Sequence, residues 1–202
     1  MKFFDVLIVG GGVAGMQCAL VLGSAKDKEY AKDKSVGIIT HQRASHLQNA
    51  KFNNVLGLPK GTLGEDILSE GKRQLTETYS SIIQIENEKV LKVEETKDGF
   101  KLITNKSFYE SKKVVLALNY AKPFEIKGLE KFVIQHKRAN PAKDRIQLKN
   151  DNFLIQENLF VCGTIAGVRS QFAIAAGSGA SVATDILTIW NDNIPTKVHD
   201  KA

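Results

Sequence analysis

Glycine residues at the spacing Gly10-x-Gly12-x-x-Gly15 are the first feature of this sequence with a chemical use. They directly follow an apolar run at residues 4–9 and precede a run at 13–25 that is rich in Ala, Leu and Met. In such a strand–turn–helix, the glycines allow a tight turn, the approach of a pyrophosphate and close packing of helix on strand. Free N–H groups and the positive end of the helix dipole then face the phosphates. The pattern predicts a dinucleotide site, although a simple turn would also use these residues.

The acidic residue that usually follows the second strand of such a site is missing. The β-branched run at residues 36–40 ends in Thr40, which is followed by His41 and Gln42. An Asp or Glu near this position normally accepts a hydrogen bond from a ribose hydroxyl. Thr40 or Gln42 could accept that bond without a charge, or all three could be surface loop residues. We assign Thr40, His41 and Gln42 to the ribose side of the site, and Val13 and Ala14 to the glycine turn.

The rest of the sequence alternates predicted strands and helices. Thr62 and Glu65 form a capping-box pattern, which predicts a helix from residue 62 to about 78. Hydrophobic periodicity predicts strands at 81–86, 89–95, 99–104, 114–117 and 159–162, a loop at 119–150 and a helix at 170–190. Together with the glycine turn, this order of elements predicts an α/β protein with a Rossmann-like, dinucleotide-binding fold. Its central parallel sheet would be flanked by helices and would carry a small antiparallel β-meander.

Composition excludes several classes of protein. The chain has 202 residues, 43% of them apolar, with 28 Lys and Arg against 22 Asp and Glu and a net charge of +6. This is ordinary for a globular domain and unlike a disordered chain, a collagen or a coiled coil. Cys18 and Cys162 are the only thiols, so we expect no disulfide framework, no metal site and a cytoplasmic location. The apolar run at 6–25 could be a signal peptide or a membrane span, but its glycines favour the strand–turn–helix and a protein without membrane contact.

Two segments near the C-terminus carry a resemblance to a known family. Residues 158–164 read Asn-Leu-Phe-Val-Cys-Gly-Thr, and residues 171–179 read Gln-Phe-Ala-Ile-Ala-Ala-Gly-Ser-Gly. Together they resemble the second FAD signature of thioredoxin reductases and, more broadly, the FAD domain of the pyridine nucleotide–disulfide oxidoreductases. Residues 116–119 stand where that family has an Ala-Thr-Gly segment, of which only Ala117 matches. The resemblance covers the first 120 residues and the last 50.

The resemblance implies FAD as the cofactor and gives roles to residues of this chain. Gly10, Gly12 and Gly15 would hold the pyrophosphate, and Thr40 to Gln42 would lie by the adenosine ribose. At the other end of FAD, the resemblance implicates Ala117, Gly163, Thr164, Gln171, Phe172 and Ala173. The helix start at the last three would face the pyrimidine edge of the flavin, where the reduced ring carries negative charge. Thr164 replaces an Asp of the family and lacks its charge-assisted hydrogen bond, so we expect weakened FAD binding or a different adenine ligand.

The chain also lacks parts of the family it resembles. Thioredoxin reductases insert an NADPH domain, which carries a CxxC pair, between the two halves of the FAD domain. The matching connection here, residues 119–144, is too short for a βαβ-based domain, and the sequence has no CxxC. We expect residues 1–202 to form a single FAD-binding domain, with halves 1–120 and 145–192 joined by a short basic crossover. Such a chain would not be a complete thioredoxin reductase.

Three functions remain open at this point. The first is a small FAD-dependent oxidoreductase that takes electrons or hydride from NAD(P)H or from a protein donor and passes them to an unknown acceptor. The second is a non-catalytic FAD- or nucleotide-binding module, or a subunit of a larger redox complex. The third is a disulfide reductase that works through Cys162. Cys162 could instead be a small residue that fills the core and does not react. The sequence assigns no catalytic residue.

Positive charge is concentrated in one segment. Residues 131–149 contain six Lys and Arg residues and one acidic residue, Asp144. This charge could steer an acidic partner or nucleic acid, or it could belong to a solvated loop. Nucleic acid is the weaker alternative, because Phe132 is the only aromatic residue in the segment. The missing inserted domain would expose apolar surface, so we also expect a homodimer or a hetero-complex.

Overall fold

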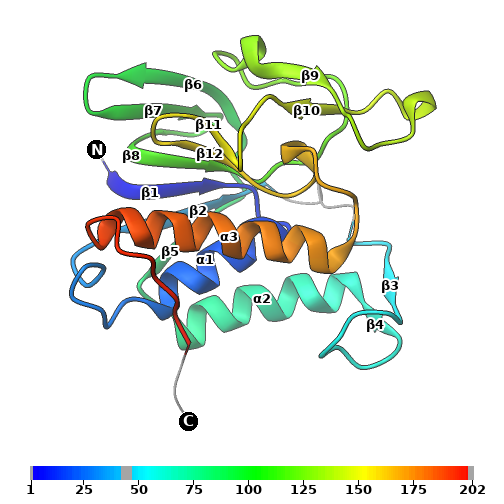
Figure 1. The fold of residues 1–202 in the computed structure, drawn as a ribbon, viewed down its shortest axis with the longest axis horizontal. Helices are drawn as coiled ribbons and strands as arrows, with labels where there is room; N and C mark the ends of the chain where they lie inside the picture. Colours follow the sequence, from blue (N-terminus) through cyan, green and yellow to red (C-terminus); the bar gives the residue numbers. More distant parts are fainter. Residues whose placement is uncertain (1, 42–46, 200–202) are drawn as a thin grey trace.

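The computed structural model describes residues 2–41 and 47–199, which form a central eight-stranded sheet and three α-helices (Figure 1). The parallel core of the sheet has the strand order β12–β8–β1–β2–β5. Its strands are Leu159–Val161 (β12), Phe108–Leu116 (β8), Phe3–Val9 (β1), Val36–Thr40 (β2) and Ile82–Glu86 (β5). The predicted α/β class and parallel sheet are confirmed.

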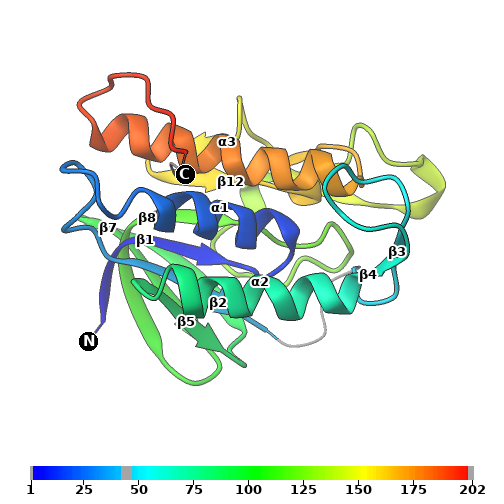
Figure 2. The same ribbon diagram turned by 90° about the horizontal axis from the view of Figure 1, so that it is seen from below.

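All three helices lie on one face of the sheet, as Figure 2 shows. They are Val13–Ser24 (α1), Gly64–Thr78 (α2) and Phe172–Trp190 (α3). Helix α1 lies between the other two and packs most extensively against α3. The two backbones approach so closely that a Cβ added at Gly179 would lie 2.0 Å from the carbonyl oxygen of Ala14. Gly179 therefore allows α3 to pack directly against the backbone of α1.

A second layer of strands covers the other face of the sheet. The meander consists of β6 (Val90–Thr96) and β7 (Gly99–Thr104), which continue antiparallel into β8. A hairpin of β9 (Val133–Gln135) and β10 (Ile146–Leu148) completes this layer. Strand β1 is thus buried on both sides, with Val6 in the helix-side core and Leu7 in the core under the meander. This explains why its sequence is continuously apolar instead of alternating.

Strand β8 is longer than the sequence indicated. We expected a strand from Val114, but β8 begins at Phe108. Its first half pairs antiparallel with β7 and its second half pairs parallel with β12, so the strand joins the meander to the parallel sheet. Ser111 occupies a core position at 1% exposure, and its hydroxyl donates to the carbonyl of Lys113 at 2.7 Å. Because Ser111 is polar but buried, residues 108–113 do not show the alternation of apolar and polar residues by which a strand is predicted.

The capping-box prediction is wrong. Helix α2 begins at Gly64, and its N-cap residue Leu63 makes no side-chain capping bond. Thr62 instead belongs to β4 (Thr62–Leu63), which pairs with β3 (Lys51–Phe52). Its hydroxyl donates to the carbonyl of Pro59 at 2.7 Å. The turn before β4 therefore uses the hydroxyl that the helix was expected to use.

The crossover between β8 and β12, residues 117–158, contains no second nucleotide-binding domain. It holds the β9–β10 hairpin, 3₁₀ turns at Glu130–Phe132 and Pro141–Lys143, and β11 (Leu154–Gln156), which pairs antiparallel with β12. The segment has more regular structure than the predicted loop, because its strands β9 and β10 pair with each other. The prediction that the inserted domain is missing is confirmed.

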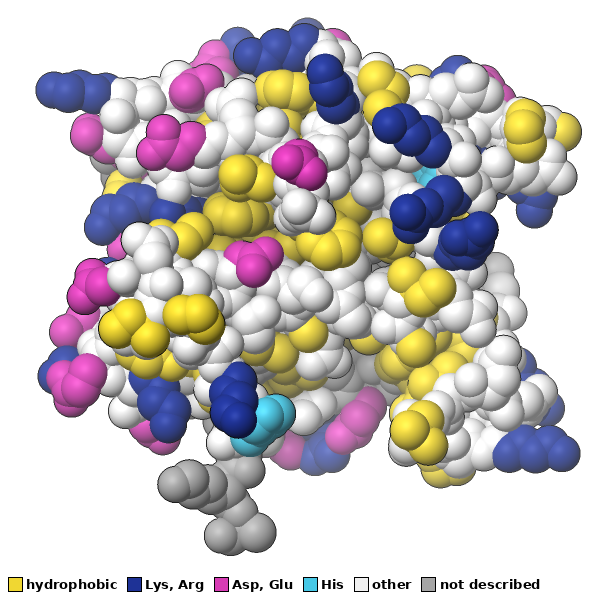
Figure 3. All heavy atoms as spheres, in the orientation of Figure 1, with side chains coloured by type: hydrophobic (Ala, Val, Ile, Leu, Met, Phe, Trp, Pro, Cys, Tyr) yellow, Lys and Arg dark blue, Asp and Glu magenta, His cyan; other side chains and the backbone are white. Residues whose placement is uncertain are grey.

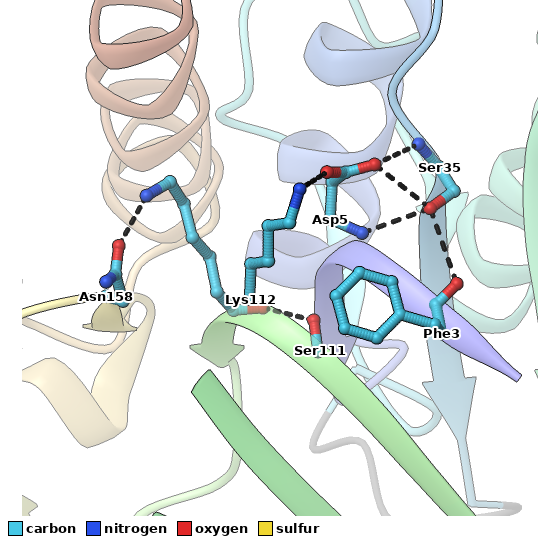
Figure 4. A network of polar contacts seen from close by, with 7 residues as sticks. Phe3, Asp5, Ser35, Ser111, Lys112 and Asn158 are labelled. Carbon is cyan, nitrogen blue, oxygen red and sulfur yellow. Dashed lines mark hydrogen bonds and ion pairs between the residues drawn. The ribbon is translucent and has the colours of Figure 1, made fainter. Parts of the chain in front are cut away.

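A polar network fixes the amino ends of β1, β2 and β8, at the edge of the sheet opposite to the glycine turns (Figure 4). The Asp5 carboxylate accepts hydrogen bonds from the Ser35 amide at 2.9 Å and from the Lys112 ammonium at 3.0 Å. Burial alone would raise the pKa of Asp5, but these two bonds, the positive charge of Lys112 and a bond from the Ser35 hydroxyl together hold the pKa below its ordinary value. Ser111 and the Lys113–Asn158 hydrogen bond belong to the same edge.

Candidate functional site

The carboxyl ends of four parallel strands meet at one edge of the sheet. Val9 of β1 pairs with Ile39 of β2 and with Leu116 of β8, and Val161 of β12 pairs with Leu116. The residues that follow these strands, at 10–15, 40–41, 117–119 and 162–164, must therefore lie side by side. In open α/β sheets, ligands bind at this edge, outside the carboxyl ends of the strands.

Backbone contacts explain two of the three signature glycines. Gly10 has φ +118°, and its N–H donates to the carbonyl of Ile39 at 2.9 Å. A Cβ at Gly10 would lie 2.3 Å from the Ala117 carbonyl oxygen, and one at Gly15 would lie 1.9 Å from the Gly10 carbonyl oxygen. No other residue fits at either position. The predicted turn thus holds strands β1, β2 and β8 together at the start of α1.

The second glycine turn depends on a serine that sequence reasoning assigned no role. Gly163 has φ +74°, and its N–H donates to Ser178 Oγ at 2.8 Å. The same hydroxyl donates to the Ala175 carbonyl at 2.7 Å, and Ser178 is buried. Ser178 therefore ties the end of β12 to the middle of α3. Its position inside a run of small residues was the available signal, but nothing in the sequence shows which backbone group it would reach.

Two helix N-termini open toward this edge without any side-chain cap. Gly12 is the N-cap of α1 and Gln171 the N-cap of α3, and neither supplies a capping hydrogen bond. Neither helix has an acidic residue in its first turn, whereas α2 has Glu65 and Asp66. The first N–H groups of α1 and α3 are thus left for other partners, and the positive ends of both dipoles are uncompensated. Such an arrangement favours a bound anion.

A pocket of about 630 Å³ occupies this edge. That volume lies within the range of about 300–1,000 Å³ for small-molecule and cofactor sites. Most residues predicted for the site line it together: Gly10, Gly12, Val13, Ala14, Thr40, His41, Ala117, Gly163, Thr164, Gln171 and Phe172. Gly15 lies behind the turn and Ala173 is exposed on α3, so neither lines the pocket. Gln42 lies outside the described residues.

The wall opposite the sheet comes from residues that the sequence analysis did not assign. Helix α2 contributes Glu65, Leu68, Ser69 and Lys72, and the segment before and within β3 contributes Leu47, Gln48, Ala50 and Phe52. Phe52 makes an edge-to-face contact with Phe172, with ring centroids 5.2 Å apart. The spacing of three and four residues along α2 is typical of one helix face and was the available signal. It does not indicate which surface that face meets.

The hydroxyl of Thr40 does not point freely into the pocket. Thr40 is buried, and its Oγ1 lies 3.5 Å from the Ile85 carbonyl oxygen of β5, a long and weak hydrogen bond. Its methyl carbon faces Gly11, where an added Cβ would lie 2.5 Å away. Lys72, the nearby charged residue of the α2 wall, pairs with Glu86 at 2.9 Å. The two pocket residues at the end of β2, Thr40 and His41, carry no carboxylate that could accept a hydrogen bond from a ribose hydroxyl.

Thr164 is connected to a buried histidine of the crossover. His136 Nε2 lies 3.1 Å from the Thr164 carbonyl oxygen. His136 Nδ1 accepts the N–H groups of Arg138 at 3.1 Å and Ala139 at 2.9 Å, so Nε2 carries the ring proton and donates to Thr164. The side chain is 5% exposed. Sequence reasoning missed His136, because its link to the pocket is a backbone carbonyl 28 residues further along the chain.

Neither cysteine can serve as a nucleophile in this fold. Both thiols are fully buried in the core between sheet and helices, and neither lines the pocket. Burial raises the pKa of Cys162 to about 12 and also raises the pKa of Cys18 well above its ordinary value. The reactive thiolate is therefore not populated at neutral pH. Within residues 2–41 and 47–199, no group of three or more His, Cys, Asp or Glu side chains is placed to hold a metal ion.

One helix of the described chain, α3, is long and apolar enough to cross a membrane by length and composition. Its inner face is buried against α1 and the sheet, including Val182, Ala183, Ile186 and Leu187. Core helices of soluble proteins pass the same test, and the packing of α3 accounts for its apolar sequence.

Comparison with known proteins identifies a family whose model matches this chain and solved structures with the same fold. Residues 4–184 match the pyridine nucleotide-disulphide oxidoreductase family. No curated protein matches the chain in sequence. Among solved structures, a thioredoxin reductase from Gloeobacter violaceus is 14% identical with a TM-score of 0.76, and all of both chains is covered.

Two further solved structures share the fold. A ferredoxin-flavin thioredoxin reductase from Clostridium acetobutylicum is 17% identical with a TM-score of 0.70, covering 95% of this chain and 99% of that one. An oxidoreductase from Agrobacterium tumefaciens is 16% identical with a TM-score of 0.69, covering 94% and 99%. The chain therefore belongs to the pyridine nucleotide-disulphide oxidoreductase family and has the fold of thioredoxin reductases.

Proposed function

We propose that this chain binds FAD in the pocket and acts as a small flavin-dependent oxidoreductase. The observation that carries the proposal is the pair of uncapped helix N-termini, α1 and α3, which open into one pocket beside two glycine turns. Helix α1 suits the pyrophosphate, and α3 suits the negative charge that a reduced flavin carries. The family and the fold support a flavin, and a structure with the same fold is described as a ferredoxin-flavin thioredoxin reductase.

Different residues of the pocket would bind different parts of the cofactor. Gly10, Gly12 and the first N–H groups of α1 would hold the pyrophosphate, and Thr40 and His41 would lie by the adenosine. Gly163, Thr164 and the N-terminus of α3 would hold the flavin end. When bound, FAD supplies the electron and hydride chemistry, and the protein binds it, orients it and excludes water. Electrons would come from NAD(P)H or from a protein donor.

Reconstitution tests this proposal directly. The purified chain, incubated with FAD and desalted, is expected to retain a flavin absorbance band and to release FAD that mass spectrometry identifies. Gly12→Asp and Gln171→Asp place a carboxylate at the two N-caps, whose extended backbones accept any residue. Asp is a good N-cap, so each variant should keep or raise the melting temperature of the apoprotein while losing FAD affinity. An apoprotein that takes up no FAD, or two Asp variants that bind it unchanged, would refute the proposal.

The alternative of a non-catalytic module has its own support. The Thr40 hydroxyl faces β5, and both thiols are buried away from the pocket. If FAD binds but neither NADH, NADPH nor a reduced protein carrier bleaches its absorbance, the module is the better description. A disulfide reductase working through Cys162 would require turnover to disappear in Cys162→Ser.

We also infer the organisation of the chain. Strand β12 and helix α3 pack directly on β8 and α1, so the halves 1–120 and 145–192 share one sheet and one core, which supports a single FAD-binding domain. A homodimer or hetero-complex remains a prediction for light scattering to test. A cytoplasmic location remains one for cell fractionation.

A further inference from the structure

An exposed basic surface borders the pocket on the side of the β9–β10 hairpin. We define it by six exposed side chains: Lys131, Lys137, Arg138, Lys143, Lys149 and Arg169. Figure 3 shows Lys and Arg side chains gathered on the upper right of this face, where Figure 1 places the β9–β10 hairpin and the segment before α3. Within the described part of the chain, no carboxylate forms an ion pair with any of the six. The nearby Asp144 is already paired with Lys122 at 2.7 Å.

This surface is fixed to the pocket instead of projecting as a free loop. His136 bonds the backbone N–H of Arg138 on one side and the pocket residue Thr164 on the other. The amide N–H of Lys137 donates to Gln147 Oε1 at 2.9 Å. Asn150 Nδ2 donates to the Ala166 carbonyl at 3.0 Å, and Arg169 directly precedes the lining residue Ser170. The positive charge is therefore held beside the pocket wall that Thr164 and Gln171 form.

Of the ligand classes that positive charge attracts, the surroundings favour a protein. Nucleic-acid surfaces interleave basic residues with exposed aromatic rings on which bases stack. Here Phe132 and Tyr120 are half-buried, and the Arg145 guanidinium covers the Tyr120 ring at 5.1 Å from its centroid. An exposed cluster of unpaired charges steers an oppositely charged partner by long-range attraction. The chain also has no domain of its own, between β8 and β12, to bring reducing equivalents to this end of the pocket.

We propose that the basic surface docks an acidic electron-carrier protein, which exchanges electrons with the cofactor. The inference rests on the proposed flavin function and names its partner class. For each FAD reduced to FADH₂, the docked carrier gives up two electrons, in one or two visits, and solvent supplies two protons. Transfer in the opposite direction releases the same numbers. The carboxylates of the partner would face Lys137, Arg138 and Arg169, beside the pocket wall.

Binding measurements test the surface independently of turnover. The probes are two acidic carriers, a plant-type [2Fe–2S] ferredoxin and a flavodoxin, with a 20-base-pair DNA duplex as the competing class. The test variant is Lys137→Glu/Arg138→Glu. Its control is Lys28→Glu/Lys97→Glu, two exposed lysines outside the crossover, which changes the net charge by the same amount. Each variant is first assayed for melting temperature and FAD content.

We expect at least one carrier to bind the wild-type chain, with affinity falling as salt rises from about 20 to 200 mM, where the Debye length shortens from about 20 to 7 Å. The test variant should bind about tenfold or more weakly, and the control variant within about twofold of wild type. Equal losses in both variants, salt-independent binding, no binding of either carrier, or tighter binding of DNA would each overturn the proposal. A chain that docks the carrier but takes up no FAD would instead refute the proposed function and leave the surface standing.

Discussion

Replacement of Ser178 by Ala gives the sharpest test of how the second glycine turn is built. The hydroxyl is the hydrogen-bond partner of the Gly163 N–H, and both groups are buried. Alanine leaves that N–H without a partner. The space left by the removed oxygen atom is too small to admit a water molecule in its place. A buried unsatisfied donor costs about 1–3 kcal/mol. The better helix propensity of alanine returns at most about 0.5 kcal/mol.

The free energy of unfolding of the apoprotein should therefore fall by roughly 0.5–2.5 kcal/mol in Ser178→Ala. For a chain of this size, each kcal/mol lowers the melting temperature by about 2–4 °C. Urea unfolding followed by far-UV circular dichroism measures the first quantity. FAD titration of the same samples should show weaker binding, because the Gly163 turn lines the pocket.

Ser181→Ala provides the matched control, since Ser181 lies one turn further along α3 with its side chain exposed. We expect this control to stay within about 0.5 kcal/mol of wild type. If Ser178→Ala behaves like Ser181→Ala in both unfolding and FAD titration, the role given to Ser178 is wrong.

Three further predictions concern packing, acid stability and thiol reactivity. Gly179→Ala should lose about 2 kcal/mol or more of unfolding free energy, because the added Cβ would overlap the Ala14 carbonyl oxygen. Gly177→Ala on the same helix, where an added Cβ meets nothing within 4 Å, should gain up to about 1 kcal/mol. Equal melting temperatures of the two variants would contradict this prediction. The pKa of Asp5 is lowered in the folded state, so its contribution is present above the unfolded pKa near 3.9 and is lost as pH falls through the folded pKa. Asp5→Asn should thus be less stable than wild type at pH 7, with a difference that shrinks in urea titrations from about pH 5 to below pH 3. Cys18 and Cys162 should react with Ellman's reagent only after unfolding, and a native thiol that reacts within minutes would show that the burial is not maintained.

Local sequence was sufficient wherever neighbouring residues set the geometry. The turn at Gly10 and the continuously apolar β1 could be read directly, because steric limits and burial on both faces act on consecutive residues. The same reasoning failed at Thr62, where a nearby carbonyl competed for the hydroxyl, and at Ser111, where a polar side chain takes a core position. In both cases, the hydroxyl forms a hydrogen bond to a nearby backbone carbonyl that the sequence pattern does not indicate.

The sequence by itself determined the order of elements, the two glycine turns and the excess of positive charge in the crossover. Only the tertiary structure decided that α2 walls the pocket, that His136 ties the basic surface to Thr164, and that the Thr40 hydroxyl turns toward β5. The physical reason is that a turn is fixed by the steric limits of a few adjacent residues. A pocket wall or a buried hydrogen bond instead joins groups far apart in the chain, and their meeting depends on how the whole sheet packs.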